Sequence, residues 1–395
     1  MFVGAEAVRI LSPASESHKC LAMRNPAGWA PQLVGRRSWT CTAAVGYIAL
    51  MTQICRDLPA IFRTSAVTVL VIAACAVSIS RGDEPLVAQD DLRQAVTRAL
   101  PLLQKAAIGH RENRTCFACH NQGIPILALT TARARGFDID EEELQKQLKF
   151  IAEFLSRNRE NYLQGQGQGG QVDTAGYALV TLELGGWQAD ETTAAVTEYL
   201  LLYQKDSPHW RTNSQRPPSE ASPFTTSYVG LRGLTAFGTA EQNERIAERR
   251  EKLKEWVLKE QAKDTEDRVF RLRALHALGA DKSDIAAASK ELADTQQEGG
   301  GFRQIDSLEP DAYATGTALA ALHQAGEMPT SDPVYQRGLR FLLKTQLEDG
   351  SWHVKSRSKP FQAYFESGFP HGKDQFISSA ASGWAATALA LACEK

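Results

Sequence analysis

Leucines recur along the chain at helical spacing, each time shortly before a glycine. A leucine stands seven residues before five glycines, and an alanine or leucine stands four residues before each of them. These glycines are Gly136, Gly186, Gly238, Gly279 and Gly326. Spacings of three and seven residues place the apolar side chains on one helix face. A glycine suits the left-handed residue that ends many helices. The pattern therefore predicts five helices of one design.

A second pattern joins a glutamine to an aromatic residue six positions later. It occurs at Gln204–Trp210, Gln296–Phe302 and Gln346–Trp352. Each copy follows an amphipathic segment, such as 338–345, and precedes a predicted loop. Gln261 ends a similar segment but has no aromatic partner. The pattern marks the ends of a second set of helices, which alternate with the first.

Together the two patterns predict six helical hairpins. The predicted pairs are 90–106 with 123–135, 141–160 with 173–185, 190–205 with 225–237, 241–262 with 266–278, 285–297 with 312–325, and 332–346 with 378–392. The second helix of each pair is rich in small residues, which favours close packing on the inside. The more charged first helices are expected outside.

Stacked hairpins bury faces that a single hairpin leaves open. Six is a number at which a two-layer ring of hairpins closes, so we expect an all-α (α/α)6 toroid with long loops at one end. An open superhelix is the alternative. A search for internal repeats thus decides the fold class before any chemistry is considered.

The segment Gln346-Leu-Glu-Asp-Gly-Ser-Trp352 resembles the QW motif of triterpene cyclases, and 296–302 and 204–210 resemble degenerate copies. The chain therefore resembles the terpenoid cyclase and protein prenyltransferase superfamily over roughly residues 90–393. In this motif the Gln is expected to bond backbone groups at a helix end, with the Trp over the same turn. The resemblance implies the toroid fold and leaves the chemistry open.

The N-terminal part predicts export. Arg56 and Arg63 precede an apolar run at 66–79, and small residues precede a cleavage site before Asp83. A charged flank, a short apolar core and a small-residue end are typical of a secretory signal. Met51 lies at a normal distance upstream and is a candidate true start. We expect residues 1–82 to be an N-terminal extension and signal peptide, followed by a toroid domain over 83–395.

Two other interpretations of this region remain open. Arg36-Arg37 resembles a twin-arginine signal, and the segment ending at Cys75 resembles a lipobox, which would anchor a lipoprotein. The apolar residues that continue after Cys75 favour cleavage at the later position. In each case the expected location is periplasmic or otherwise extracytoplasmic, and no membrane-spanning segment is expected after signal removal.

The segment Cys116-Phe-Ala-Cys119-His120 is a CxxCH sequence in a predicted loop at 110–122. This motif is typical of c-type haem attachment, with two thiols for the porphyrin vinyl groups and His120 as the proximal iron ligand. A Cys-x-x-Cys disulfide and another metal site are the alternatives. No zinc is expected, because no second Cys-x-x-Cys pair exists. Covalent haem c is therefore the expected cofactor.

The aromatic and polar loop at 360–376 is the expected neighbour of the CxxCH loop if the toroid closes. It carries His371, which we predict as a candidate distal haem ligand. His371, Lys373 and Asp374 are close enough in sequence to form a site of their own. The alternative is a loop folded on its own aromatic side chains.

The cyclase and prenyltransferase motifs are weak in this chain. Asp138-Ile-Asp140-Glu141 is the nearest match found to the Asp-x-Asp-Asp acid of class II cyclases, but acidic residues at a helix start are ordinary caps. Asp311-Ala-Tyr313 has a tyrosine where the prenyltransferase zinc site has a cysteine, with His371 as the matching histidine. No catalytic residue is assigned on these grounds.

Three functions therefore stay open. The first is an exported haem protein with an electron-transfer or redox role and a redox partner. The second is a cyclase- or prenyltransferase-like enzyme acting on an isoprenoid or lipid. The third is a non-catalytic binding toroid. Nucleic acid is not an expected partner, because the formal net charge is −2 and no run of basic residues occurs. A deep apolar cavity with acidic residues at its floor would favour the second function.

Overall fold

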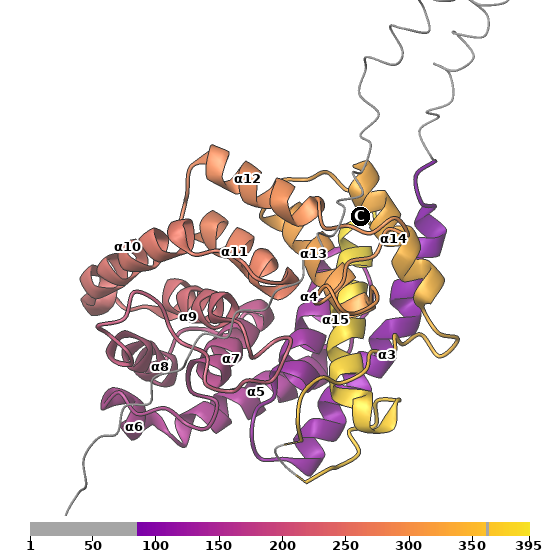
Figure 1. The fold of residues 1–395 in the computed structure, drawn as a ribbon. Coiled ribbons are helices and arrows are strands. Elements are labelled where there is room, and N and C mark those ends of the chain that lie inside the picture. The colour runs from indigo at the N-terminus through magenta and orange to yellow at the C-terminus, as the bar shows by residue number, and fades with distance from the viewer. Residues whose placement is uncertain (1–84, 361–362) are drawn as a thin grey trace, which may run out of the picture. The chain divides into compact units, whose positions relative to one another are not determined.

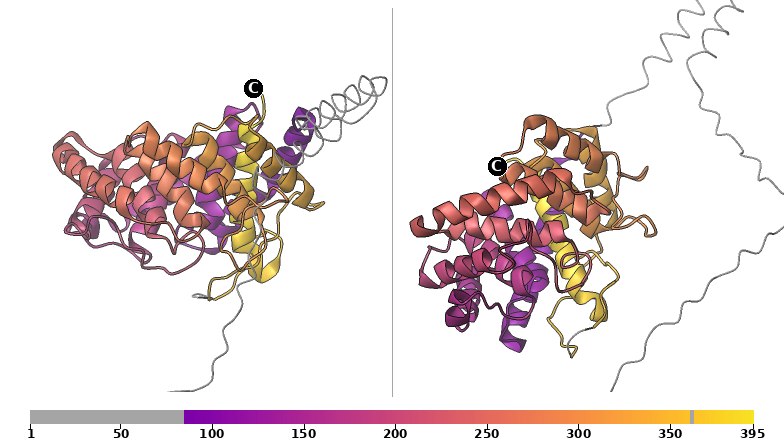
Figure 2. Two further views of the ribbon diagram at one scale, coloured as in Figure 1. Left: turned by 45° about the horizontal axis from the view of Figure 1, so that its top comes forward. Right: turned by 60° about the vertical axis from the view of Figure 1, so that its left-hand side comes forward.

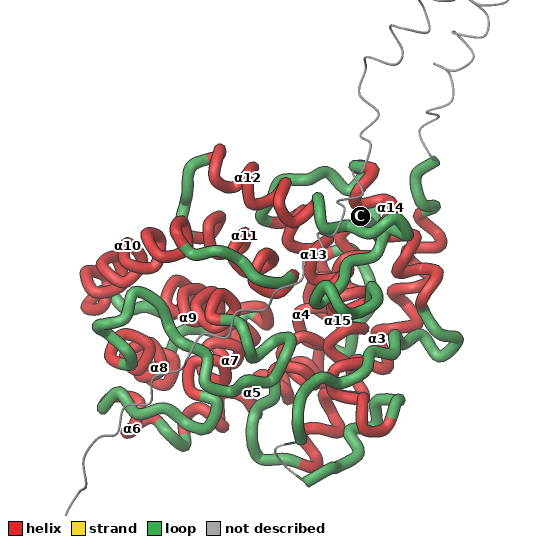
Figure 3. Tube along the Cα trace, viewed as in Figure 1, coloured by secondary structure: helices red, strands yellow, loops and turns green. Residues whose placement is uncertain are grey.

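The computed structural model describes residues 85–360 and 363–395, and within them the chain forms six helical hairpins and no β-strand (Figures 1 and 3). The outer helices are α3 (Gln89–Asn113), α5 (Glu141–Ser156), α8 (Glu191–Leu202), α10 (Asn243–Lys259), α12 (Lys282–Ala293) and α14 (Pro333–Thr345). The inner helices are α4 (Ile124–Ala134), α7 (Gln171–Gly185), α9 (Pro223–Phe237), α11 (Thr265–Ala277), α13 (Ala312–Gln324) and α15 (Gln375–Leu391). All six predicted pairs are confirmed.

The inner helices form a closed ring. Each one packs against the next in chain order, and α15 packs against α4, so the last hairpin meets the first (Figure 2). The predicted (α/α)6 toroid is confirmed, and the open superhelix is wrong. The apolar core lies between the two layers and along the inner ring.

Small residues allow the inner helices to approach closely, as predicted. A Cβ at Gly316 of α13 would lie 2.6 Å from the backbone carbon of Trp384 in α15. A Cβ at Gly176 of α7 would lie 2.9 Å from the backbone carbon of Val229 in α9. No real Cβ makes contacts this short with backbone atoms, so only glycine fits at these two crossings.

Two of the QW segments, those at Gln346 and Gln296, connect their hairpin to the next one. The Gln346 amide donates to Ala95 O of α3 at 2.8 Å and to Gly350 O at 3.0 Å, while the Trp352 indole donates to Leu342 O at 2.9 Å. Gln296 repeats this arrangement with carbonyl groups of the loop and of α14. The expected role of the Gln differs from the structure, because the Trp indole bonds the helix-end carbonyl while the Gln amide bonds the loop and the neighbouring hairpin.

The seam between the first and last hairpins has further hydrogen bonds. Gln89 Oε1 accepts from Glu394 N at 2.9 Å, and Arg135 donates to Cys393 O at 3.0 Å. Val87 N donates to the Gln336 side chain of α14 at 2.8 Å. These contacts join segments some 250 to 300 residues apart in the chain.

Several predicted boundaries differ from the structure. Helix α3 continues to Asn113, and a π-helical turn, η1 (Cys119–Gly123), runs directly into α4, so the loop predicted at 110–122 is only residues 114–118. The reason is burial, because His110 is 1% exposed and extends the core face of α3. The predicted helix 141–160 is divided into α5 and a short α6 (Arg159–Leu163).

The predicted helix-ending glycines also differ in part. Gly136, Gly186 and Gly279 have the expected left-handed conformation. Gly238 has an extended backbone, with φ −63° and ψ 137°. In the fifth hairpin the left-handed residue is Glu327, which follows Gly326. At Gly326 a Cβ would lie 2.5 Å from Ser289 Oγ, so close packing is the reason for a glycine there.

The predicted signal peptide, Met51, Cys75 and the cleavage site before Asp83 lie outside the described residues. Two short 3-10 turns, η2 (Ala240–Gln242) and η3 (Gly372–Asp374), complete the elements. None of the helices in the described part of the chain is long and apolar enough to cross a membrane.

Candidate active site

The centre of the inner ring is polar at the helix N-termini and aromatic further along. On α11, Glu266, Phe270 and Arg273 follow one another at spacings of four and three residues, so they share one face. On α7, Asp173 and Tyr177 have the same relation. In both helices the acidic residue lies one turn before an aromatic residue that lines the central cavity.

The cavity has a volume of about 110 Å³ and is lined mainly by apolar and aromatic side chains. They include Ile124, Tyr177, Val180, Tyr228, Phe270 and Trp384. Arg273 also lines it and is 7% exposed. Its Nη1 donates to Gln324 at 3.1 Å, whereas its Nε and Nη2 have no hydrogen-bond partner among the described residues. A buried guanidinium with free donors is a binding group for an anion.

The N-terminus of α11 carries three acids in the segment Asp264-Thr-Glu266-Asp267. Asp264 caps the helix by accepting from Asp267 N at 3.0 Å. Asp267 accepts from Ser222 Oγ at 2.6 Å and from Lys263 N at 3.0 Å. Asp264 and Asp267 therefore hold the local backbone through these hydrogen bonds, and Glu266 is the candidate acid of the three.

Glu266 is 5% exposed and faces the ring interior. Its Oε1 accepts from Thr225 Oγ1 of α9 at 3.0 Å and lies 3.4 Å from the hydroxyl of Tyr313 in α13. Its Oε2 has no partner among the described residues. Burial, with the negative charge of Asp264 as the next contribution, raises the pKa of Glu266 to about 8. The carboxyl is therefore largely protonated at neutral pH and has an oxygen free to donate.

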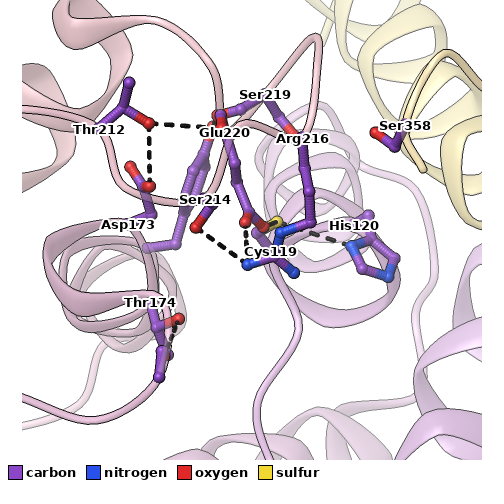
Figure 4. Close-up of polar contacts among 12 residues, drawn as sticks. Cys119, His120, Asp173, Thr174, Thr212, Ser214, Arg216, Ser219, Glu220 and Ser358 are labelled. Atoms are coloured by element: carbon purple, nitrogen blue, oxygen red, sulfur yellow. Dashed lines mark hydrogen bonds and ion pairs between the residues drawn. The ribbon is translucent and has the colours of Figure 1, made fainter. Parts of the chain in front are cut away.

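Asp173 is a second buried acid on this level of the ring, drawn in Figure 4. It is 1% exposed and accepts from Thr226 Oγ1 at 2.5 Å and from Thr212 Oγ1 at 3.4 Å. Burial raises its pKa to about 7, although the Thr226 hydrogen bond opposes the shift. The N-terminal level of the ring thus holds two carboxyl groups that burial keeps near the protonated state.

The CxxCH residues have different environments. Cys116 is exposed, whereas Cys119 is buried and donates its S–H to Glu220 Oε1 at 2.9 Å (Figure 4). The Nδ1 of His120 lies 3.7 Å from the Cys119 sulfur. Burial raises the pKa of the Cys119 thiol and lowers the pKa of His120 to about 3, so both groups are neutral in this state.

This arrangement bears on the predicted haem. Two thiols that bind one porphyrin must face it together, with the imidazole below the iron. Here Cys119 and His120 are directed toward Glu220, and Cys116 is on the surface. Attachment would require Cys119 to leave Glu220 and turn toward Cys116. The haem therefore stays a prediction from the motif.

The loop after Trp352 and the start of α15 both lie beside the CxxCH segment, as expected for a closed ring, and Arg114 donates to Ala363 O of the loop at 2.8 Å. Phe376 contacts the His120 ring edge-on at 5.2 Å, and Ser379 donates to His120 O at 3.2 Å. His371 is placed elsewhere, with its Nε2 2.8 Å from Ser351 Oγ and its ring stacked on His353 at 4.7 Å. The structure does not bring His371 to His120.

Two acidic segments lie at helix starts, one on an outer helix and one on an inner helix. Asp138 and Asp140 are exposed at the start of outer helix α5, where Asp140 caps by accepting from Glu143 N, so the capping interpretation is confirmed. The segment that begins at Asp264 matches Asp-x-Asp-Asp with Glu in place of the third residue, and it starts an inner helix. That match was visible in the sequence. Glu220 had no such signal, because it belongs to an irregular loop.

No family model matches the chain, and no curated protein matches it in sequence. Solved structures do match. A variant of the type II terpene cyclase MstE from Scytonema, in complex with geranylgeranyl dihydroxybenzoate, aligns at 12% identity with a TM-score of 0.50, covering 77% of this chain and 98% of that one. This likeness shows the fold.

Two further structures align less closely. Apo MstE matches at 13% identity over 78% of this chain and 99% of that chain, with a TM-score of 0.49. A possible member of the GH105 family from Salmonella enterica matches at 12% identity over 78% and 94%, with a TM-score of 0.46.

Proposed function

We propose that this protein is an acid-catalysing toroid enzyme that transfers a proton from Glu266 to a small unsaturated lipid or isoprenoid in the central cavity. The observation that carries the proposal is a buried, largely protonated carboxyl with a free oxygen, one helical turn from an aromatic cavity. Glu266 does not itself line the cavity, but it lies one turn before Phe270, which does. Enzymes place acids of raised pKa where a proton must be delivered near neutral pH.

The cavity suits an apolar reacting group. An engineered apolar cavity of about 150 Å³ holds benzene, so about 110 Å³ accommodates one five-carbon isoprene unit. The rings of Tyr228, Phe270 and Trp384 offer π-faces that stabilise a developing positive charge. This volume is below the range of about 300 to 1,000 Å³ typical of ligand pockets, so a longer chain would have to displace side chains of the inner helices that line the cavity.

Arg273 is the expected binding residue for an anionic group at the far end of the ligand from Glu266. It lies seven residues after Glu266 on the same helix face, which corresponds to about 10 Å along the axis. Its free Nε and Nη2 donors would pair with a carboxylate or phosphate. The favoured substrate is therefore an unsaturated chain with an anionic group, with the reacting double bond near Glu266 and the anion near Arg273.

The chemistry follows from these positions. The Glu266 hydroxyl donates its proton to one alkene carbon, the π electron pair forms the new C–H bond, and the adjacent carbon becomes cationic. The resulting carboxylate is stabilised by the hydroxyl groups of Thr225 and Tyr313. A water molecule takes a proton from a neighbouring carbon, which gives an isomerised or cyclised alkene, and the hydronium ion so formed returns a proton to the Glu266 carboxylate.

Deuterium incorporation tests this function. The full chain is incubated in D2O with geranylgeranoic acid and with geranylgeraniol, and the products are analysed by mass spectrometry for carbon-bound deuterium. We expect incorporation with the acid, and a loss of about 10²- to 10⁴-fold in Glu266→Gln. Glu298→Gln, which changes an exposed glutamate, is the matched control. Binding of these compounds without incorporation by any form would overturn catalysis and support the non-catalytic binding toroid.

A second candidate function rests on the CxxCH motif itself. Covalent haem held by Cys116, Cys119 and His120 would supply electron-transfer chemistry to an exported protein, and the chain would need a redox partner. A pyridine haemochrome spectrum of the protein from a host that matures c-type cytochromes tests it. A c-type absorption band retained after denaturation, and lost in Cys116→Ala, would support this function. A colourless protein would remove it.

A further inference from the structure

Three metal-binding side chains meet beside the candidate active site. Cys119 Sγ, a ring nitrogen of His120 and a carboxylate oxygen of Glu220 all lie within 4.8 Å of one another. Cys119 and His120 belong to the π-turn η1, whereas Glu220 comes from the loop before α9, about a hundred residues later. The 2.9 Å hydrogen bond between Cys119 and Glu220, residues that Figure 4 draws side by side, joins these two segments.

The spacing is close to what one ion needs. Zinc binds thiolate at about 2.3 Å and imidazole or carboxylate at about 2.0 to 2.2 Å, so the ligand atoms of a tetrahedral site lie roughly 3.3 to 3.6 Å apart. The Cys119 sulfur is already 3.7 Å from His120 Nδ1. Its distance to Glu220 Oε1 is 2.9 Å, which is a hydrogen bond and must lengthen by about half an ångström when an ion replaces the proton.

The carboxylate is fixed from behind. Arg216 binds Glu220 Oε2 at 2.5 Å, and the two residues also exchange both backbone hydrogen bonds, at 2.9 and 3.0 Å. Ser358 donates to Pro217 O at 2.8 Å and so ties this loop to the loop after Trp352. Outer contacts of this kind orient metal ligands and hold their geometry. Oε1 is left facing Cys119.

The buried side-chain amide of Asn121, next to His120 in the sequence, has unmet hydrogen-bonding capacity. The residue is 0% exposed, and neither atom of its amide has a hydrogen-bond partner among the described residues. An unsatisfied buried amide costs about 1 to 3 kcal/mol unless water or a ligand meets it.

We propose that Cys119, His120 and Glu220 form a three-ligand site for a thiophilic divalent cation, with Zn²⁺ as the favoured ion and a fourth position open to water or a small ligand. The thiolate and carboxylate together balance the charge of the ion, and the Cys119 proton is released to solvent when the S–metal bond forms. Thiolate and imidazole ligands favour zinc over magnesium or calcium. An open fourth position is typical of catalytic zinc sites.

Zinc at this site would contradict the expectation of no zinc, which was based on the absence of a second Cys-x-x-Cys pair. The proposed site does not rest on the proton-transfer function, because Glu266 is not a ligand. It competes with haem, since both would use Cys119 and His120.

Metal binding to the purified full chain tests the proposal. The protein is freed of metal with a chelator, then titrated with Zn²⁺ and, as a spectroscopic probe, with Co²⁺. We expect about one ion per chain, with a thiolate-to-cobalt charge-transfer band and the visible bands of a tetrahedral ion. Cys119→Ser removes the charge-transfer band, and Glu220→Gln lowers the Zn²⁺ affinity by about 100-fold.

Cys116→Ser is the matched control, because it removes the other thiol of the same motif but lies outside the cluster. It is expected to bind both ions like the parent protein. Circular dichroism at the melting transition shows that each variant is folded. Equal losses in Cys116→Ser and Cys119→Ser, unchanged affinity in Glu220→Gln, absence of bound ion, or a c-type haem on the isolated protein would each overturn the proposal.

Discussion

Burial makes the ionised form of Glu266 unfavourable, whereas the proposed function requires that this residue give up its proton. A carboxyl with 5% exposure next to Asp264 is destabilised in its ionised form, and its burial favours the protonated form. A glutamine of similar shape would fill the site without a titrating group. The presence of an acid at this position is therefore explained by proton transfer better than by packing.

The activity should depend on pH through Glu266. Because its pKa is raised to about 8, the protonated form is present below that value and is lost above it. Deuterium incorporation is expected to be constant on the acid side and to fall as the pH passes through about 8. Tyr313→Phe removes a hydrogen bond that favours the ionised form, so the descending limb should move to higher pH. A descending limb that Tyr313→Phe leaves unmoved would contradict the assignment.

The same group makes a prediction for stability. Between pH 4.5, the ordinary value, and about 8, the unfolded chain has lost the Glu266 proton while the folded chain retains it. The unfolded state then binds fewer protons, so the free energy of unfolding falls as pH rises, by about 1.4 kcal/mol per pH unit inside this window. Relative to Glu266→Gln, the parent protein should lose stability from pH 5 to 8 in urea titrations. Parallel pH profiles for the two proteins would show that Glu266 is ionised in the fold.

At the residue scale only part of the candidate site could be predicted from the sequence. The acidic pair Glu266-Asp267 can be recognised in the sequence. Acidic residues at helix starts are usually N-caps, however, and Asp264 is one. Only depth in the ring distinguishes the catalytic candidate from the cap. The contact of Cys119 with Glu220 depends on how an irregular loop folds between hairpins, and no periodic pattern describes such a loop.

At the scale of helices, periodicity was sufficient. The repeated Leu and Gly positions and the small-residue faces located all six hairpins, because hydrophobic spacing reflects which face is buried. Boundaries moved where a polar residue continued the core face, as His110 does in α3. The arginines that contact the QW glutamines from the next outer helix, Arg98 and Arg337, were not predicted, because surface arginines have no distinctive spacing.

The crossing of α13 and α15 should not tolerate a side chain at Gly316. Its Cβ would meet the Trp384 backbone at 2.6 Å, and neither helix can move without disturbing the ring. Gly316→Ala is expected to lower the free energy of unfolding by about 1 to 3 kcal/mol or more, measured by urea titration. Gly299→Ala, where nothing lies within 4 Å of the new Cβ, is the control. Equal stability of the two variants would show that the crossing is loose.

The QW glutamine at the seam should contribute measurably to stability. Gln346→Ala removes donors from Ala95 O and Gly350 O, which costs about 1 to 3 kcal/mol in unfolding experiments. Gln261→Ala, at the corresponding position of the repeat that lacks an aromatic residue, is exposed and should change little. Similar losses in both variants would mean that the seam contact adds nothing specific.

At the scale of the described unit, closure distinguishes this ring from an open stack of repeats. Every inner helix has two inner neighbours, so neither end of the stack needs a polar capping repeat. The first and last hairpins supply each other's missing contacts through α4 with α15 and through Gln346 with α3. We attribute the single closed architecture to this pairing of sequence-distant faces.

The seam can form only after the last helix has been synthesised, because α4 packs against α15. Helix α4 leaves the ribosome about 250 residues before α15, its partner in the ring. At a translation rate of about 5 to 20 residues per second, the apolar face of α4 stays without that partner for roughly 10 to 50 s. Contacts of such long range form late in folding. The nascent chain is thus a natural client for a chaperone that covers the first hairpin until the last one arrives.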